Sequence, residues 1–159
     1  MNPTRYLVGL VTFVWILAVA AEPPDERWQV VSNEAFSFSI PTTLKKTDLH
    51  GTDAFFEVYR GNGIDLHVYY GTHTHGFPDW PKEATYEEIQ VNGVSARIGT
   101  VQRTPRDSPD KYFITEIYFE ETKHPAVKLA ISATCRTEKE VQLAKKIFQT
   151  IRVAGKSTK

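Results

Sequence analysis

The chain has 159 residues, of which 41% are hydrophobic and 24% are charged. This size and composition fit one folded domain with an adequate hydrophobic core, and they exclude an intrinsically disordered protein. Lysine plus arginine and aspartate plus glutamate both total 19, and the two signs are interspersed along the chain. The sequence therefore lacks the basic field that would attract nucleic acid or anionic lipid, and we expect no nucleic-acid partner.

The N-terminal segment has the order of a secretory signal peptide. Arg5 supplies a positive charge, residues 6–19 are almost continuously apolar, and small residues including Ala20 and Ala21 follow. The apolar stretch is shorter than the roughly 20 residues that a spanning helix needs, which favours cleavage over a permanent anchor. We therefore expect residues 1–21 to be removed, with the cut after Ala20 or Ala21, and the protein to be periplasmic or secreted.

Cys135 is the only cysteine of the chain, so the sequence allows no intramolecular disulfide. No cysteine follows the apolar stretch to accept a lipid, and we expect no lipid anchor. A catalytic thiol needs a partner base and an electropositive setting. No local signature of that kind surrounds Cys135, which we interpret as a small buried residue.

A polar, proline-rich lead-in at residues 22–27 precedes a region in which the hydrophobic period is two, the period of β-strands. Residues 36–40 alternate apolar and polar side chains up to a proline. Residues 54–60 and 64–70 flank a Gly-Asn-Gly sequence and predict a hairpin. We expect residues 36–40 to form a strand with one dry face, and residues 54–60 to form a strand with aromatic side chains on both faces.

A second hairpin is predicted where Asn92-Gly93 separates residues 88–91 from residues 94–98. Asn-Gly favours a type I′ turn, because both central residues of that turn need a positive φ. Residues 111–120 and 126–134 are rich in β-branched and aromatic side chains and predict two further strands.

The C-terminal end alone has a convincing helical pattern. Thr137 and Glu140 have the spacing of a capping box, and apolar side chains then recur at helical spacing up to Ile151. Together these elements predict an α+β domain over residues 28–154, in which an antiparallel sheet of about six to seven strands is covered by the C-terminal helix. Residues 155–159 are predicted to be a disordered tail.

Three stretches of the chain resemble the PsbP-like α/β/α sandwich group. They are an aromatic-rich strand running into a proline (36–41), the Asn-Gly hairpin (89–96) and a stretch that resembles the closing helix of the group (148–153). The resemblance implies an antiparallel sheet flanked by helices. It implies little about function, since members include photosystem accessory proteins, Ran-release factors and bacterial envelope proteins, and what these share is mostly non-catalytic binding. Residues 71–87 depart from the pattern, because they hold few helical positions where members often have a helix.

The long connection at residues 71–86 is the most unusual segment, and long irregular connections are enriched in function. Phe77 and Trp80, with Asp79 between them, are candidates for an interaction surface that binds a partner protein or small ligand. Large aromatic side chains are usually at least partly buried. We therefore favour the interpretation that both rings cover a satellite cluster beneath the loop.

His73 and His75 are two residues apart, so both imidazoles project from one side if the segment is extended. His67 or Asp79 could supply a third ligand, and such a set suits zinc or copper. A His-x-His pattern alone is a weak indication of a metal site, and solvated loop histidines are the simpler interpretation.

Known catalytic templates are missing from the sequence, including a Gly-x-Ser-x-Gly elbow, a phosphate-binding glycine-rich loop and a His-Glu-x-x-His motif. The glutamate pairs at 87–88 and 120–121 would point to opposite faces of a strand. We therefore expect no catalytic residue and no cofactor. The sequence favours an exported, non-catalytic binding or accessory domain. The alternatives are a small envelope metal-binding protein that uses the histidine loop, and a small hydrolase without a recognisable motif.

Overall fold

The computed structural model describes residues 27–49, 55–74, 76–77, 80–104, 112–120, 122 and 126–154. The predicted signal peptide, almost all of the lead-in and the predicted tail lie outside these residues. Within the described part of the chain, no helix is both long and apolar enough to cross a membrane.

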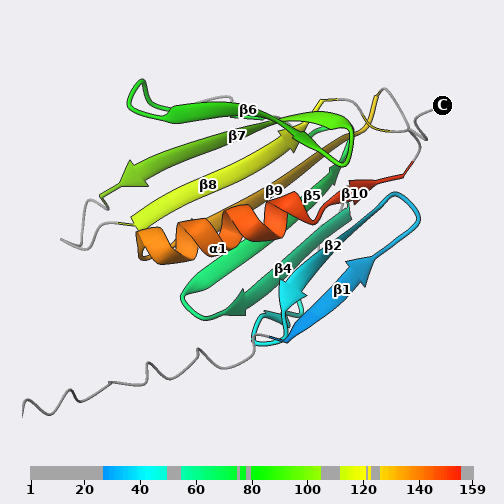
Figure 1. Ribbon diagram of the computed structural model, residues 1–159, viewed down its shortest axis with the longest axis horizontal. Helices are drawn as coiled ribbons and strands as arrows, with labels where there is room; N and C mark the ends of the chain where they lie inside the picture. The colour runs from blue at the N-terminus through cyan, green and yellow to red at the C-terminus, as the bar shows by residue number, and fades with distance from the viewer. Residues whose placement is uncertain are drawn as a thin grey trace, which may run out of the picture.

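The described residues form ten strands and one helix (Figure 1). In chain order they are β1 (Trp28–Ser32), β2 (Phe36–Pro41), β3 (Lys45–Lys46), β4 (Phe55–Gly61), β5 (Ile64–Gly71), β6 (Thr85–Val91), β7 (Val94–Arg103), β8 (Tyr112–Phe119), β9 (Lys128–Cys135), α1 (Glu138–Gln149) and β10 (Arg152–Val153).

The strands form two antiparallel sheets. The larger sheet has seven strands in the order β3-β4-β5-β9-β8-β7-β6, and the smaller has three in the order β1-β2-β10. Helix α1 packs against β8, β9 and β2, and it lies with the small sheet on one face of the large sheet (Figure 1). The predicted α+β class, antiparallel sheet and C-terminal helix are confirmed.

The second sheet was not predicted from the sequence. It arises because β2 does not join an edge of the large sheet but lays its apolar side chains on the face of that sheet. Phe36, Phe38 and Ile40 are all buried there in the main hydrophobic cluster. The backbone of β2 then pairs with β1 on one side and with the two-residue β10 on the other.

The core fills the space between the large sheet and the layer made by α1 and β2. Its largest fully buried side chains include Phe38, Phe119 and Phe148. Burying one such ring stabilises the fold by about 1.5–3 kcal/mol. The apolar stripe of α1 faces this core, as predicted, through Val141, Ala144, Ile147 and Phe148. The predicted continuation of the helix to Ile151 and over 148–153 is wrong, because α1 ends at Gln149 and residues 152–153 pair with β2 as strand β10.

Both predicted hairpin turns are confirmed by the backbone. Asn62 and Gly63 have φ of 49° and 76°, and Asn92 and Gly93 have φ of 50° and 81°. Positive φ at both central residues is the type I′ geometry, which fixes the register of the strands that it joins. The register decides which side chains of β4 to β9 point away from the helix. The candidate site lies on the face of the large sheet that these side chains form.

Candidate functional site

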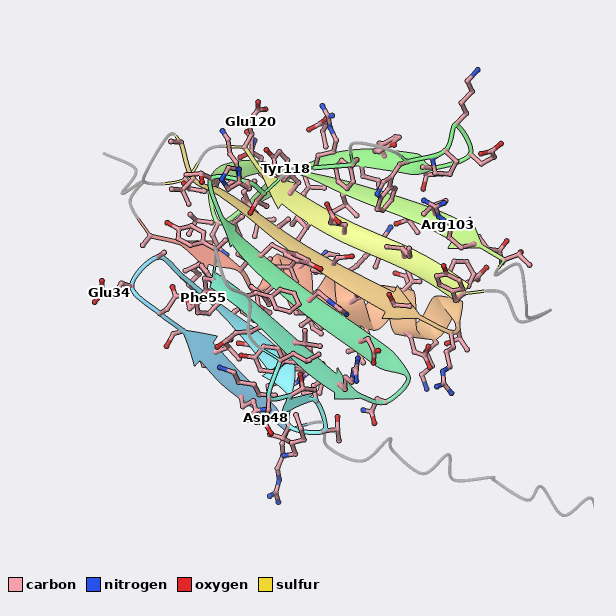
Figure 2. The ribbon with its side chains drawn as sticks, turned by 180° about the vertical axis from the view of Figure 1, so that it is seen from behind. Glu34, Asp48, Phe55, Arg103, Tyr118 and Glu120 are labelled. Carbon is pink, nitrogen blue, oxygen red and sulfur yellow. The ribbon has the colours of Figure 1, made fainter. Side chains whose placement is uncertain are left out.

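The face of the large sheet that points away from α1 is called the open face here. Side chains alternate along a strand, so the buried Leu66 and Val68 of β5 place His67 and Tyr69 on the open face. Figure 2 views the molecule from behind, toward this face, and labels Tyr118 of β8 on it.

One row of side chains crosses the open face at the middle of the sheet. Gly99 of β7 is opposite Glu116 of β8, Glu116 is opposite Ser132 of β9, and Ser132 is opposite His67 of β5. Directly opposite residues lie about 4.5–5.5 Å apart. The fold therefore brings a carboxyl, a hydroxyl and an imidazole together from three separate parts of the sequence.

Glu116 is the most unusual side chain of this row, because it is a mostly buried carboxyl. The backbone N–H of Phe77 and the hydroxyl of Ser132 both donate hydrogen bonds to it. Its Oε1 atom is buried and has no hydrogen-bond partner among the described residues. Burial raises the pKa of Glu116 to about 7, although the two hydrogen bonds act in the opposite direction.

Neighbouring groups on the open face respond to the same environment. The pKa of Tyr69 is raised, mainly by burial and to a smaller extent by the nearby Glu116 carboxyl. Burial is also the main reason why the pKa of Tyr118 is raised and that of His67 is lowered. His67 is consequently neutral at neutral pH.

The connection between β5 and β6, called the aromatic loop here, folds back over β7. The rings of Phe77 and Trp80 are half-buried and meet edge to face, with centroids 4.9 Å apart. Phe77 also contacts Tyr86 at 5.5 Å and Tyr118 at 6.4 Å between centroids. The two rings thus pack over β7 while staying half-buried, and the predicted interaction surface of Phe77, Trp80 and Asp79 stays a prediction.

Gly99 makes this packing feasible. A Cβ atom at this position would lie 2.7 Å from ring atoms of both Phe77 and Trp80. The missing side chain leaves the space that the two rings occupy above β7. Phe77 itself has a φ of 51°, a left-handed conformation that is uncommon for a bulky residue and that persists only where surrounding contacts impose it.

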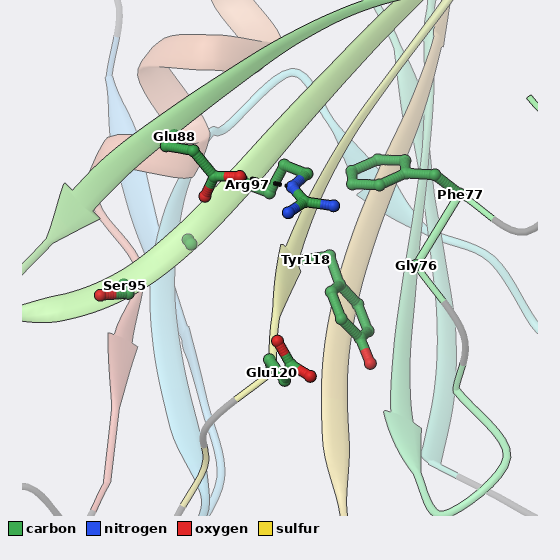
Figure 3. Close-up of a pocket in the computed structure, with 8 residues that line it drawn as sticks. Gly76, Phe77, Glu88, Ser95, Arg97, Tyr118 and Glu120 are labelled. Atoms are coloured by element: carbon green, nitrogen blue, oxygen red, sulfur yellow. Dashed lines mark hydrogen bonds and ion pairs between the residues drawn. The ribbon is translucent and has the colours of Figure 1, made fainter.

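Beside the aromatic loop the open face is hollowed into a groove of about 250 Å³ (Figure 3). Its lining residues come from the loop and from β6, β7 and the end of β8. They are Gly76, Phe77, Glu88, Ser95, Ala96, Arg97, Tyr118 and Glu120. The groove thus combines two aromatic rings with side chains of both charges.

Arg97 lies at the centre of the groove, near Phe77 and Tyr118 (Figure 3). Its Nε donates to Oε1 of Glu88 at 2.6 Å. No other hydrogen bond of its guanidinium occurs among the described residues, so both terminal nitrogens are available to a ligand acceptor. Glu120 adds an exposed carboxylate at the rim and has no ion-pair partner among the described residues.

A second hollow of about 350 Å³ lies along α1 and the β4–β5 turn. Its walls are mainly the long side chains of exposed helix residues, including Lys139, Gln142 and Lys146. It contains no aromatic ring and no buried polar group. The groove on the open face is the better defined candidate site.

The residues predicted for a metal site are only partly described. His67 lies on the open face, and His73 is exposed in the aromatic loop. His75 and Asp79 lie outside the described residues. Within the described ranges, no group of three or more histidine, cysteine or acidic side chains is arranged to hold a metal ion. The zinc or copper site therefore stays a prediction.

Other predicted side chains are placed directly. Cys135 is buried at the end of β9, and burial raises the pKa of its thiol to about 12. Glu87 and Glu88 point to opposite faces, since Glu87 contacts Lys145 of the helix and Glu88 contacts Arg97 on the open face. Neighbouring glutamates on β6 thus form no dyad, as predicted.

Sequence reasoning missed Glu116, Arg97 and Tyr118. One indication was present, because Glu116 is the only charged residue in the strand that became β8. A glycine inside a strand, as at Gly99, is a second indication of a close approach by another group. Neither pattern shows which loop approaches.

The described residues form an antiparallel α+β fold with a mixed-charge groove on the face of the large sheet that points away from α1. Comparison with known proteins adds no relative, since the sequence matches no model of a known protein family and no curated protein.

Proposed function

We propose that the protein is an exported, non-catalytic binding domain, and that the groove on the open face is its binding site. The groove beneath the aromatic loop is the observation that carries the proposal. It brings Arg97, Glu120 and two aromatic rings to one place on a rigid antiparallel sheet. Aromatic and arginine side chains are the residues that most often dominate binding energy at protein interfaces.

The ligand proposed for this groove is an extended segment of a partner protein. At about 250 Å³ the groove is smaller than most pockets that enclose small molecules, which measure about 300–1,000 Å³. Strand β6 lies beside it at the edge of the large sheet, with no described strand on its outer side. An extended segment can pair with such an edge and place alternate side chains over the neighbouring face. Arg97 and Glu120 would then meet side chains of opposite charge.

A hydrolytic function has less support. The hydrogen bond from Ser132 to Glu116 has the form of a nucleophile and its base. Neither residue lines the groove, and Glu116 is covered by the backbone of Phe77. A substrate bound in the groove would therefore not reach the hydroxyl.

Photo-cross-linking from inside the groove tests the proposal. A photoreactive amino acid replaces Ser95, an exposed residue of the groove wall, in the protein expressed with its own N-terminus. The matched control carries the same amino acid at Val30, which is 72% exposed on the small sheet. We expect a partner to be captured from position 95 and not from position 30. Equal capture at both positions would contradict a groove-specific site.

The captured partner is then purified and its affinity measured by calorimetry. We expect Arg97→Ala to weaken binding by at least tenfold, because truncating an arginine that acts as an interface hot spot costs about 2 kcal/mol or more. Lys146→Ala, on the exposed side of the helix, serves as the control and should leave affinity unchanged. An unchanged affinity in Arg97→Ala would reject the groove as the binding site.

A further inference from the structure

The outer edge of the small sheet has unused backbone hydrogen-bonding groups. Strand β1 pairs with β2 on one side and with no described strand on the other. At one end of the strand the Thr42 N–H donates to the Arg27 carbonyl at 2.8 Å, and at the other end the Asn33 N–H donates to the Phe36 carbonyl at 3.0 Å. Hydrogen-bonded pairs alternate along an antiparallel ladder, so the odd-numbered residues of β1 bond to β2. The N–H and C=O groups of residues 28, 30 and 32 therefore point toward the open edge.

The same edge exposes apolar side chains on the outer face of the small sheet. Val31 is opposite the buried Phe38 and points to the core, whereas Val30 is opposite Ser39 and points outward. Val30 is 72% exposed, and Trp28, which shares its face, is 39% exposed. Strand β1 contains no charged side chain. An uncharged edge strand with exposed apolar residues is a template for pairing with another strand.

The other edge strands carry features that oppose such pairing. Strands β3 and β10 have two residues each, and both begin with a charged residue, Lys45 and Arg152. Strand β6 is longer, but Glu88 lies at its centre. Pairing of β6 with its own copy about that residue would place two carboxylates directly opposite each other. Charge and short length protect sheet edges, and β1 alone among the described edge strands lacks both.

We propose that the protein forms a homodimer in which β1 pairs antiparallel with β1 of a second copy, about a two-fold axis at Val30. In this register Val30 is opposite Val30, and Trp28 is opposite Ser32 of the second copy. The opposite residues are those whose N–H and C=O groups are free, so each such pair can exchange two hydrogen bonds. Trp28 and Val30 of the two copies then cover one another on the outer face. The three strands of each small sheet join into one continuous sheet.

The charges that flank β1 favour a second copy of this chain as the occupant. Arg27 and Glu34 lie at opposite ends of the strand, and both are exposed without an ion-pair partner among the described residues. Figure 2 labels Glu34 at the turn between β1 and β2. The antiparallel pairing brings Arg27 of each copy to the end that carries Glu34 of the other, whereas a parallel pairing would bring like charges together.

The position of β1 leaves the proposed binding site free. The small sheet lies on the α1 face of the large sheet (Figure 1), and the groove lies on the opposite, open face. The inference therefore does not depend on the proposed function. If both hold, the dimer presents two grooves, and a partner that carries two copies of its segment would bind more tightly through both. An interface of one strand pair is small, and we expect a dissociation constant that is roughly micromolar.

Sedimentation velocity tests the dimer. The protein is expressed with its own N-terminus, purified in the form that accumulates and measured over a series of micromolar concentrations, with far-UV circular dichroism as the check on folding. We expect the parent protein to change reversibly from monomer to dimer. Val30→Lys should stay monomeric, because two lysines would lie directly opposite at the centre of the pairing. Gln142→Lys adds the same charge at an exposed position of α1 and should associate like the parent.

A charge exchange tests the register, and it also serves if Val30→Lys does not fold. Arg27→Glu should weaken association several-fold, since each end of the pairing then holds two glutamates. Arg27→Glu/Glu34→Arg exchanges the two charges and should restore it. A parent protein that stays monomeric, a dimer that persists in Val30→Lys, or a double variant as weak as Arg27→Glu would overturn the proposal.

Photo-cross-linking identifies the occupant of the edge. The photoreactive amino acid at Val30, the control position for the groove, should join two copies of this chain, and the mass of that product distinguishes it from a groove partner. Capture of a different protein at position 30 would overturn the second copy as the occupant. Capture from position 95 remains measurable in a Val30→Lys protein, so failure of the dimer and failure of the groove are distinguishable.

Discussion

The roles of Gly99 and Glu116 on the open face depend on the aromatic loop that packs over them, and not on their own chemistry alone. Gly99 carries no side chain, yet its missing Cβ atom makes room for two aromatic rings that come from another segment. Glu116 would be a solvated surface carboxyl on a bare strand, but the loop that crosses Gly99 turns it into a buried one. The two residues are opposite each other on β7 and β8, so they act as one unit.

Gly99→Ala should therefore loosen the aromatic loop. The new methyl group would lie 2.7 Å from atoms of both rings, and overpacking of this kind typically costs about 1–3 kcal/mol. We expect stability to fall by that amount in urea unfolding and Trp80 to become more accessible to acrylamide. In a Gly99→Ala/Phe77→Ala protein the two costs should be less than additive, since one of the obstructing rings is gone. Full additivity would show that the rings do not pack there.

At the scale of elements, the sequence predicted most of what the local backbone can specify. The Asn-Gly turns and the capping box at Thr137 are confirmed because each depends on neighbouring residues alone. The small sheet and the aromatic loop depend on contacts between distant segments. Ser39 and Thr150, for example, are joined by a hydrogen bond across 111 positions of the sequence. Such a contact between distant segments cannot be predicted from local sequence patterns.

The capping box of α1 provides an element-scale prediction. The Thr137 N–H donates to Oε2 of Glu140 at 3.0 Å, and the Glu140 N–H donates to Oγ1 of Thr137 at 3.3 Å. We expect Thr137→Ala to lower stability by about 1 kcal/mol in urea unfolding. Gln142→Ala, an exposed change on the same helix, should alter stability by no more than about 0.5 kcal/mol. Groove binding should be unaffected by either, because α1 lies on the opposite face of the large sheet.

The candidate site could be predicted only in part. The aromatic loop and its two rings were identified from the sequence, because a long connection with Phe77 and Trp80 is unusual in itself. The groove next to it was not, since Arg97, Tyr118 and Glu120 come from two strands whose adjacency depends on the register of β7 against β8. Register across a long connection is set by the packing of the whole sheet.

For the whole molecule, the predicted export of the chain can be tested by mass. We expect the protein expressed with its own N-terminus to accumulate outside the cytoplasm as a species that begins at Ala21 or Glu22, because the segment before it has the order of a signal peptide. Intact mass spectrometry of the purified protein measures the cut directly. Changing both Ala20 and Ala21 to bulky residues should block cleavage at either position, and a wild-type protein that retains Met1 or Asn2 would contradict the prediction.

The pairing of β2 with β10 has a consequence for when the protein can fold. Arg152 and Val153 pair with Ser37 and Phe36, so one of the first strands to be synthesised waits for the last. Helix α1, which fills the space between β2 and the large sheet, is likewise made after all the strands of that sheet. Until the ribosome has released these residues, the apolar sides of β2, β5 and β9 have no cover. A nascent chain with this order therefore cannot complete its core until α1 and β10 have been made, a property that fits the export proposed above.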